Sequence, residues 1–246
     1  MKIVRFVYKD RIYDGILEGG YVTADMSLPA KGKVAVRDVR LLPPVNPSKI
    51  ILVGLNYADH AEELGMERPL NPIIFLKPTT ALIGPEDAII YPEASCRVDY
   101  EAELAVVIKS IARKVKRSDA AEHILGYTCL NDVTARDIQK SDGQWTRAKS
   151  FDTFSPIGPW VETDLDPSDL KITASLNGEM KQSSRTSKFI FDIPYLIEFI
   201  SGVMTLLPGD VISTGTPAGI GPMLPGDEIT IDIEGIGKLT NHVRKG

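Results

Sequence analysis

Short apolar runs rich in β-branched residues, separated by glycine and proline, predict a chain made mostly of strands. The segments expected as strands are residues 2–8, 11–17, 49–53, 73–76, 97–108, 125–130, 171–176, 210–213, 228–233 and 238–242. Lys9 and Asp10 form the expected turn between the first two. The 17 prolines and 20 glycines supply the many turns that such a chain needs.

Three segments have helical patterns instead. In residues 59–64, Asp59 is the expected N-cap, Glu62 follows as in a capping box, and Gly65 ends the helix. The second segment, 134–142, follows an apolar run. The third, 192–200, is apolar on all sides, so we expect it to pack in the core or at a subunit interface and to end at Ser201-Gly202.

Strands and long helices do not alternate along the chain, which argues against a doubly wound parallel sheet. The sequence therefore predicts a predominantly β fold with a few helices, arranged as a roll or a sandwich. The proline-rich run 43–47 is typical of a linker. We expect it to separate a small N-terminal β domain, residues 1–45, from a larger domain, residues 46–246.

Composition narrows the class of protein. With 246 residues, 43% of them hydrophobic, the chain can bury a substantial core. Its net charge of −5 and single short basic run, 113–117, argue against nucleic-acid binding, and we interpret that run as a solvated turn. Cys96 and Cys129 lack metal-ligand spacing, so we expect reduced thiols. Because no apolar stretch has the length of a membrane span or a signal segment, we expect a soluble, cytoplasmic protein.

Two glutamates two residues apart are the first candidates for chemistry. On a strand through 97–108, Glu101 and Glu103 point to one face, with Cα atoms about 7 Å apart. The apolar second half of this strand predicts burial, and buried carboxylates repel unless one is protonated or a cation lies between them. Mg²⁺ and Mn²⁺ prefer carboxylate oxygens, and Asp132, where another apolar run ends, offers a third ligand. The alternative is an exposed strand edge with two solvated glutamates.

A histidine and a glutamate share one face of the helix predicted at 59–64. His60 and Glu63 are three residues apart, so the carboxylate can orient the imidazole and raise its basicity. This arrangement suits a general base that acts on water. The alternative is a capped surface helix with a solvated histidine, although Gly54 nearby permits close approach to a site.

An arginine and a glutamine could bind an anionic substrate. Arg136 and Gln139 share a face of the helix predicted at 134–142, and such a pair can hold a carboxylate. Alternatively, Arg136 pairs with Asp132 or Asp137 at the surface. Three carboxylates around one divalent ion leave a net negative charge, which favours nearby cations if the substrate is an anion.

Two lysines and a glycine-rich loop complete the candidates. Lys149 and Lys77 are further cations for the site, or ordinary exposed lysines. The loop 213–222 lacks the lysine of a phosphate-binding loop, which argues against a nucleotide site. We expect it to let the backbone approach a ligand closely, with Thr216 offering a hydroxyl, or to be simply a tight loop.

Taken together, these segments resemble the fumarylacetoacetate hydrolase family. The similar blocks are GLNYADH (54–60), FLKP (75–78), DYEAEL (99–104), NDVTARD (131–137), KSFD (149–152) and TGTP (214–217). The resemblance extends from about Pro44 to the C-terminus and depends on the order of the blocks as much as on their content.

The resemblance implies roles for ten residues. The implied ligands of an octahedral Mg²⁺ or Mn²⁺, with Ca²⁺ as a further option, are Glu101, Glu103 and Asp132. The implied catalytic residues are His60, Glu63 and Lys149. The resemblance places His60 and Glu63 on a lid that orders when substrate binds. The implied substrate-binding residues are Arg136, Gln139, Thr216 and Lys77.

The resemblance also implies a mixed β-sandwich roll, a homodimer and a small 2-oxo acid as substrate. The short chain is similar to the compact branch of acylpyruvases, decarboxylases and isomerases. The expected function is metal-dependent hydrolysis of a C–C bond in acylpyruvate-like 2,4-dioxo acids, through an enolate that the metal stabilises. Oxaloacetate-type decarboxylation and 2-hydroxyhepta-2,4-diene-1,7-dioate isomerisation are alternatives, and a noncatalytic metal-binding β domain is a remote one. Residues 66–71 and 141–146 are expected to set specificity.

Overall fold

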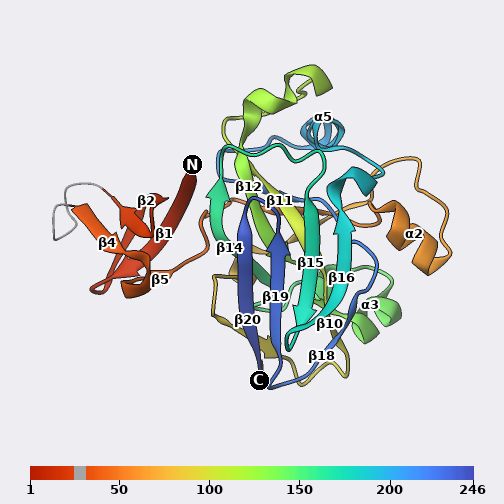
Figure 1. Cartoon of the computed structure of the whole chain (residues 1–246). Coiled ribbons are helices and arrows are strands. Elements are labelled where there is room, and N and C mark those ends of the chain that lie inside the picture. Colours follow the sequence, from red (N-terminus) through yellow and green to blue (C-terminus); the bar gives the residue numbers. More distant parts are fainter. Residues whose placement is uncertain (25–31) are drawn as a thin grey trace.

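Most of the chain lies in three β-sheets (Figure 1). The computed structural model describes residues 1–24 and 32–246, so residues 25–31 of the expected N-terminal β domain lie outside the described part. Few helices accompany the sheets, which confirms the predicted fold class.

Twelve strands of the described residues form the largest sheet. In spatial order they are β4 (Lys33–Ala35), β3 (Tyr21–Thr23), β2 (Arg11–Glu18), β1 (Lys2–Tyr8), β14 (Ser155–Glu162), β12 (Ile124–Asn131), β11 (Ala102–Ile108), β17 (Val211–Ser213), β6 (Ile50–Val53) and β7 (Ile74–Lys77), with β5 (Arg40–Leu41) beside β1 and β8 (Leu82–Ile83) beside β14. Every residue of β11 is buried, because both faces of this central strand are covered.

Two smaller sheets complete the β structure. One consists of β16 (Glu179–Arg185), β15 (Lys171–Leu176), β19 (Glu228–Ile233), β20 (Gly237–Lys245) and β9 (Ala88–Tyr91). The other consists of β13 (Thr134–Ala135), β10 (Val98–Tyr100) and β18 (Gly221–Met223). The five-stranded sheet packs across β11, β12 and β14, and the main apolar core lies between these two layers (Figure 1).

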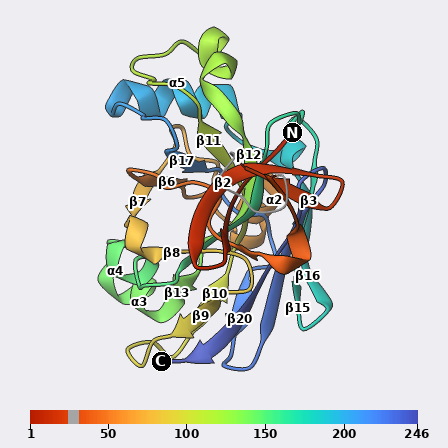
Figure 2. The same ribbon diagram turned by 90° about the vertical axis from the view of Figure 1, so that its left-hand side faces the viewer.

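Helices cover the ends and edges of the sheets (Figure 2). The α-helices are α2 (Ala58–Leu64), α3 (Arg136–Asp142), α4 (Thr146–Lys149) and α5 (Ile193–Val203). The 3-10 helices are η1 (Val36–Asp38), η2 (Thr79–Ala81), η3 (Arg117–His123) and η4 (Thr186–Lys188). None of the helices in the described part of the chain has both the length and the apolar character needed to cross a bilayer.

Strands β1 to β5 lie at one side of the molecule (Figure 1). They enclose a separate apolar cluster around Val4, Phe6 and Tyr13. The pairing of β1 with β14 nevertheless joins them to the large sheet, with Lys2 opposite Glu162. The domain boundary at residue 45 therefore stays a prediction.

The single strand predicted at 97–108 is wrong in one detail that matters for the site. The backbone leaves one sheet after β10 and enters another at β11, and Glu101 lies at the crossing. The Glu101 N–H donates to the side-chain oxygen of Asn131 (2.9 Å), and its carbonyl accepts the N–H of Asp132 (2.9 Å). The bond from Asp132 continues the β11–β12 register by one residue, whereas the Asn131 side chain takes the place of a backbone acceptor. Glu101 and Glu103 still reach one cluster, as expected for two residues on one face of a strand.

The helix starts also needed correction. Helix α2 begins at Ala58 with Tyr57 as N-cap, so the capping-box interpretation of Asp59 and Glu62 is wrong. Asp59 instead accepts a hydrogen bond from the hydroxyl of Ser184. The predicted stop at Gly65 is confirmed, with a left-handed φ of 62°.

Two further helices, α3 and α5, have other boundaries than predicted. The helix predicted at 134–142 starts at Arg136, because residues 134–135 pair with β10 as β13. The predicted start of α5 is confirmed by Asp192, whose side chain accepts the N–H of Tyr195, but the helix continues to Val203. Strands β14 and β16 were missed because the first contains two prolines and a glycine and the second is mostly polar.

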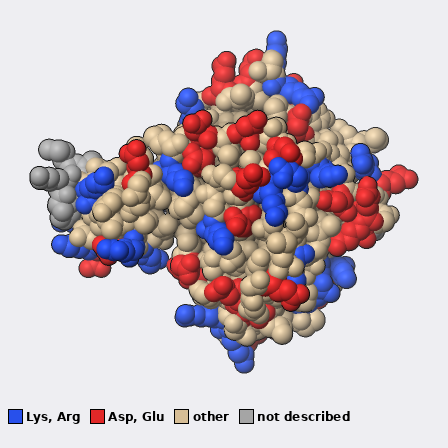
Figure 3. Space-filling view, in the orientation of Figure 1, with Lys and Arg blue, Asp and Glu red and all other residues tan. Residues whose placement is uncertain are grey.

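Lys and Arg side chains are interspersed with Asp and Glu over the face drawn in Figure 3. That part of the described surface therefore does not form a broad positive field of the kind that nucleic-acid binding requires.

Helix α5 offers a matched test of the core. Leu196 is fully buried, whereas Val203 on the same helix is 62% exposed. Leu196→Ala should lower the free energy of unfolding by about 2–5 kcal/mol because it leaves a cavity. Val203→Ala should change it by less than about 0.5 kcal/mol. Equilibrium urea unfolding measures both, and equal losses would contradict the described packing of α5.

Candidate active site

A cavity of about 330 Å³ opens beside the large sheet, between α2, α3 and the loop that follows β17. The predicted site residues that line it are His60, Glu101, Asp132, Arg136, Gln139, Lys149 and Thr216. Glu63, Glu103 and Lys77 contact these residues from behind. A wider depression of about 620 Å³ on the outer face of the five-stranded sheet contains none of the predicted residues.

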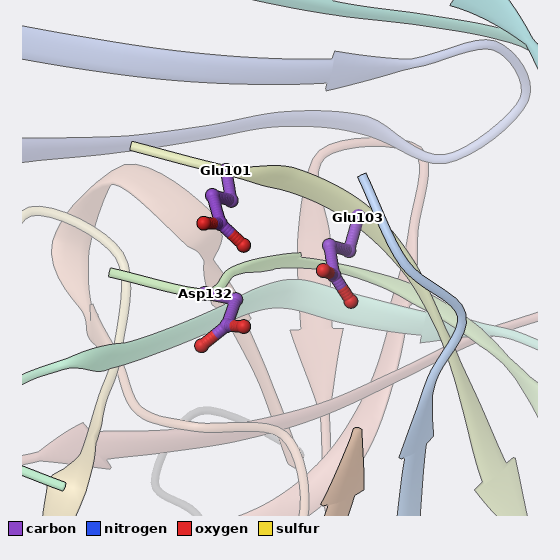
Figure 4. A group of neighbouring side chains, drawn as sticks. All are labelled: Glu101, Glu103 and Asp132. Atoms are coloured by element: carbon purple, nitrogen blue, oxygen red, sulfur yellow. The ribbon is translucent and has the colours of Figure 1, made fainter. Parts of the chain in front are cut away.

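Three carboxylates meet at this cavity, with Glu101 and Asp132 on its lining and Glu103 behind them. Glu101 lies between β10 and β11, Glu103 lies on β11, and Asp132 directly follows β12. One oxygen of each lies within 4.8 Å of the other two, and all three residues are buried (Figure 4). The pairing of β11 with β12 places Ala102 opposite Asn131, which brings the two acidic segments together.

This cluster fits a hard divalent cation. Its donors are all carboxylate oxygens, the ligands that Mg²⁺ and Mn²⁺ prefer. Burying three negative charges is unfavourable unless positive charge accompanies them. The cluster could therefore hold a divalent metal ion.

Two buried lysines also contact the cluster. The ammonium of Lys149 donates to Glu101 (2.9 Å) and Asp132 (2.5 Å). Burial lowers the pKa of Lys149, but these two carboxylates outweigh burial and raise it. The ammonium of Lys77 donates to the other oxygen of Asp132 (2.6 Å) and to the carbonyls of Val133 (3.1 Å) and Phe154 (2.5 Å). Lys77 is thus placed to hold Asp132, and this geometry does not support its predicted contact with substrate.

The surroundings of Glu101 and Glu103 shift the pKa values of the two carboxyl groups in opposite directions. Burial raises the pKa of Glu101, but Lys149 and Arg136 outweigh it and hold the pKa well below its usual range. Burial raises the pKa of Glu103 well above its usual range, and the charges of Asp132 and Glu101 raise it further. Glu103 accepts hydrogen bonds from the Ser213 hydroxyl and the Gly215 N–H rather than from a cation. A divalent cation in the cluster would remove the repulsion that favours protonated Glu103.

Arg136 is held by a network that the sequence did not predict. Its Nε donates to Asp99 (2.9 Å), its Nη1 donates to Gln139 (2.6 Å), and its Nη2 donates to Glu101. The predicted neighbourhood of Arg136 and Gln139 is therefore present, whereas the alternative pairing with Asp132 or Asp137 is not. Asp99 is fully buried, and its role could have been suspected only from its place two residues before Glu101.

His60 and Glu63 form the expected pair on α2. The imidazole Nδ1 lies 2.9 Å from one carboxylate oxygen of Glu63, whose other oxygen accepts the N–H of Gly219 (3.0 Å). When Nδ1 donates to Glu63, Nε2 keeps a lone pair on the side of the ring away from Glu63. His60 lines the cavity, so its Nε2 can accept a proton from a ligand bound there.

The glycine-rich loop brings its backbone to the acidic cluster, and its predicted approach to a ligand stays a prediction. Gly215 has a φ of +90°, and a Cβ there would lie 2.9 Å from the Cβ of Asn56. Its N–H donates to Glu103 (3.0 Å), so only glycine lets the backbone reach this carboxylate without strain. Asn131, Ser213 and Gly215 were missed as supports of the acidic cluster.

Aromatic and basic side chains form the cavity wall. Trp145 packs edge-on against Phe75, with ring centroids 5.3 Å apart, and Met66 lies on the same cavity. Met66 and Trp145 belong to the segments expected to set specificity. Lys140 also lines the cavity, and it makes no ion pair with any residue in the described part of the chain.

Residues 49–244 match the family model described as the C-terminal part of fumarylacetoacetate (FAA) hydrolase. The chain belongs to the fumarylacetoacetate hydrolase family. The match covers most of the chain and includes all ten predicted site residues, from His60 to Thr216.

The names of similar proteins refer to different reactions. Mitochondrial oxaloacetate tautomerase Fahd2a of Rattus norvegicus is 44% identical over 214 residues, 82% of this chain and 68% of that protein. A 2-hydroxyhepta-2,4-diene-1,7-dioate isomerase from Mycobacterium marinum is 45% identical, with a TM-score of 0.92 over 100% of this chain and 98% of that chain. A maleylpyruvate hydrolase from Sphingobium sp. SYK-6, in complex with manganese(II) ion and pyruvate, is 31% identical, with a TM-score of 0.85 over 100% of both chains.

The acidic cluster is tested by removing one charge. Glu101→Gln keeps the shape of the side chain but removes a charged ligand, so affinity for Mn²⁺ should fall by at least about 10-fold. Glu93→Gln, at an exposed position, is the control and should bind Mn²⁺ as the unaltered protein does. Isothermal titration calorimetry measures both, and unchanged affinity in Glu101→Gln would remove Glu101 from the ligand set.

Proposed function

We propose that this protein is a divalent-metal-dependent enzyme that acts on small, enolisable 2-oxo acids, with His60 as the base that moves a proton. The observation that carries this proposal is His60, paired with Glu63, on the wall of the cavity that Glu101 and Asp132 of the buried acidic cluster also line. The acidic cluster alone would suit a noncatalytic metal-binding domain, whereas an oriented imidazole beside it has a use in catalysis.

Glu101, Glu103 and Asp132 would hold Mg²⁺ or Mn²⁺, which when bound supplies Lewis-acid polarisation of the 2-oxo group. The Arg136 guanidinium and the Gln139 amide would bind and orient the carboxylate of the substrate. Lys149, already between Glu101 and Asp132, would keep positive charge beside that anion. Trp145 and Phe75 would exclude bulk water from the reacting atoms.

His60 would transfer the proton. In tautomerisation of an enol, Nε2 takes the proton of the 2-hydroxyl and the resulting imidazolium returns a proton to C3, which gives the 2-oxo form. In hydrolysis of a 2,4-dioxo acid, Nε2 takes a proton from water, and the hydroxide attacks the C4 carbonyl. The C3–C4 bond then breaks, which releases a carboxylic acid and the enolate of pyruvate, and the imidazolium returns its proton to C3 of that enolate. Glu63 would stabilise the imidazolium in either case.

The presence of His60 as a base favours some of the candidate reactions over others. Loss of CO₂ from oxaloacetate requires no proton abstraction, so the His60–Glu63 pair favours the other two reactions over decarboxylation. We place tautomerisation or isomerisation of a 2-oxo acid first, because relatives with these names are 44% and 45% identical to this chain. C–C bond hydrolysis, expected from the sequence, is the second candidate and is favoured by the maleylpyruvate hydrolase at 31% identity.

A substrate panel tests the proposal directly. Enol-oxaloacetate, 2-hydroxyhepta-2,4-diene-1,7-dioate, acetylpyruvate and fumarylpyruvate are each followed spectrophotometrically with Mg²⁺, with Mn²⁺ and with EDTA. We expect turnover that requires the metal, and the compound consumed identifies the reaction. A protein that binds metal but turns over none of these compounds would contradict the proposal.

The base assignment has its own test. His60→Ala should lower kcat by roughly 10²–10⁴-fold, because general-base catalysis contributes that much. Affinity for Mn²⁺ should stay the same, since His60 is not in the acidic cluster. His242→Ala, a partly exposed histidine on β20, is the matched control. Activity near that of the unaltered protein in His60→Ala would exclude His60 as the base.

A variant of Lys140 tests whether the substrate carries a second, distal carboxylate. Oxaloacetate, maleylpyruvate and 2-hydroxyhepta-2,4-diene-1,7-dioate, which name the three relatives, all carry two carboxylates, and Lys140 lines the cavity without an ion pair in the described chain. Lys140→Met should raise KM about 10-fold for the dicarboxylates and leave KM for acetylpyruvate within about 2-fold. An equal change for both classes would exclude a contact with the distal carboxylate.

A further inference from the structure

Gln182 is the one buried side chain of strand β16 in an otherwise exposed or half-exposed row. It is 1% exposed, and it lies directly behind the loop that carries Thr216. A buried amide in a polar edge strand requires partners for both its oxygen and its nitrogen.

The partners of Gln182 fix the orientation of its amide. The backbone N–H of Ala102 donates to Oε1 (3.0 Å), and Nε2 donates to the backbone carbonyl of Pro217 (2.8 Å). A backbone N–H can only donate and a backbone carbonyl can only accept, so the amide cannot be turned over. Ala102 lies between Glu101 and Glu103, which ties this amide to the strand that carries both carboxylates.

The fixed amide determines how the Thr216 hydroxyl is used. The second hydrogen of Nε2 is directed at Thr216 Oγ1, 2.9 Å away, so this oxygen accepts from Gln182. The hydroxyl proton must then point elsewhere. Within residues 1–24 and 32–246 it donates to no protein acceptor, and Thr216 is only 3% exposed and lines the cavity.

We propose that Gln182 is a positioning residue that keeps the Thr216 hydroxyl a hydrogen-bond donor toward an anionic oxygen of the ligand. The chemical nature of this ligand, a small 2-oxo acid, rests on the proposed function. Gln182 supplies the directing bond from outside the cavity and does not touch the ligand. A ligand with an oxygen at this point is favoured over one with an N–H or O–H there, because two donors would face each other.

Neutron diffraction on ligand-free crystals tests the orientation without reference to activity. The deuteron on Thr216 Oγ1 should point into the cavity, and the deuterons on Gln182 Nε2 should point to Thr216 and Pro217. A Thr216 deuteron directed at Gln182 would overturn the proposal.

Binding of oxalate, a planar dianion, to the Mn²⁺-loaded protein tests the consequence by calorimetry. Thr216→Val should weaken binding by about 10–100-fold, since hydrogen bonds to charged groups contribute that much. Gln182→Glu should cause a similar loss, because its carboxylate accepts the Thr216 proton. The double variant should bind no more weakly than Thr216→Val alone.

Two further variants separate positioning from folding. Gln182→Met keeps the volume but leaves the hydroxyl free to donate, so the loss should stay below about 3-fold. Ser183→Ala, at the neighbouring exposed position, should bind as the unaltered protein does. Losses that multiply in the double variant, or an equal loss in Gln182→Met and Gln182→Glu, would overturn the proposal. If the unaltered protein binds no oxalate, the proposed function fails, whereas the neutron result still decides the role of Gln182.

Discussion

Three buried carboxylates whose oxygens lie within 4.8 Å of one another are the constraint on which the site depends. Such a cluster is unfavourable without compensating positive charge, and the fold supplies it from Lys77, Lys149 and Arg136. Each of these cations comes from a different element. The sheet, α4 and α3 must therefore be in place together before the carboxylates can be buried.

The crossing of the chain between two sheets at Glu101 makes this arrangement possible. Glu101 and Glu103 reach the same cluster although the regular backbone pairing is interrupted beside Glu101. At the crossing, the Asn131 side chain and the Asp132 N–H hold the Glu101 backbone and draw the two acidic segments together. Polar side chains that bond to backbone commonly replace ladder partners where strands leave a sheet.

The cavity is organised in two layers of contacts. Asp132, His60 and Thr216 face the ligand space, and each of the three is oriented by a group that does not line the cavity. Lys77 holds Asp132, Glu63 holds His60, and an amide behind Thr216 directs its hydroxyl. Groups fixed in this way lose little freedom when a ligand binds, which favours both affinity and catalysis.

The sequence by itself determined the β-rich class, the family and the acidic cluster, because apolar periodicity and blocks such as DYEAEL are local properties of the chain. It did not determine the crossing at Glu101, the place of Lys77 behind Asp132, or the roles of Asp99 and Gln182. These features depend on contacts between segments tens of residues apart, such as Gln182 with Ala102. Tertiary structure decided them, because a buried polar group takes its role from the partners that packing brings to it.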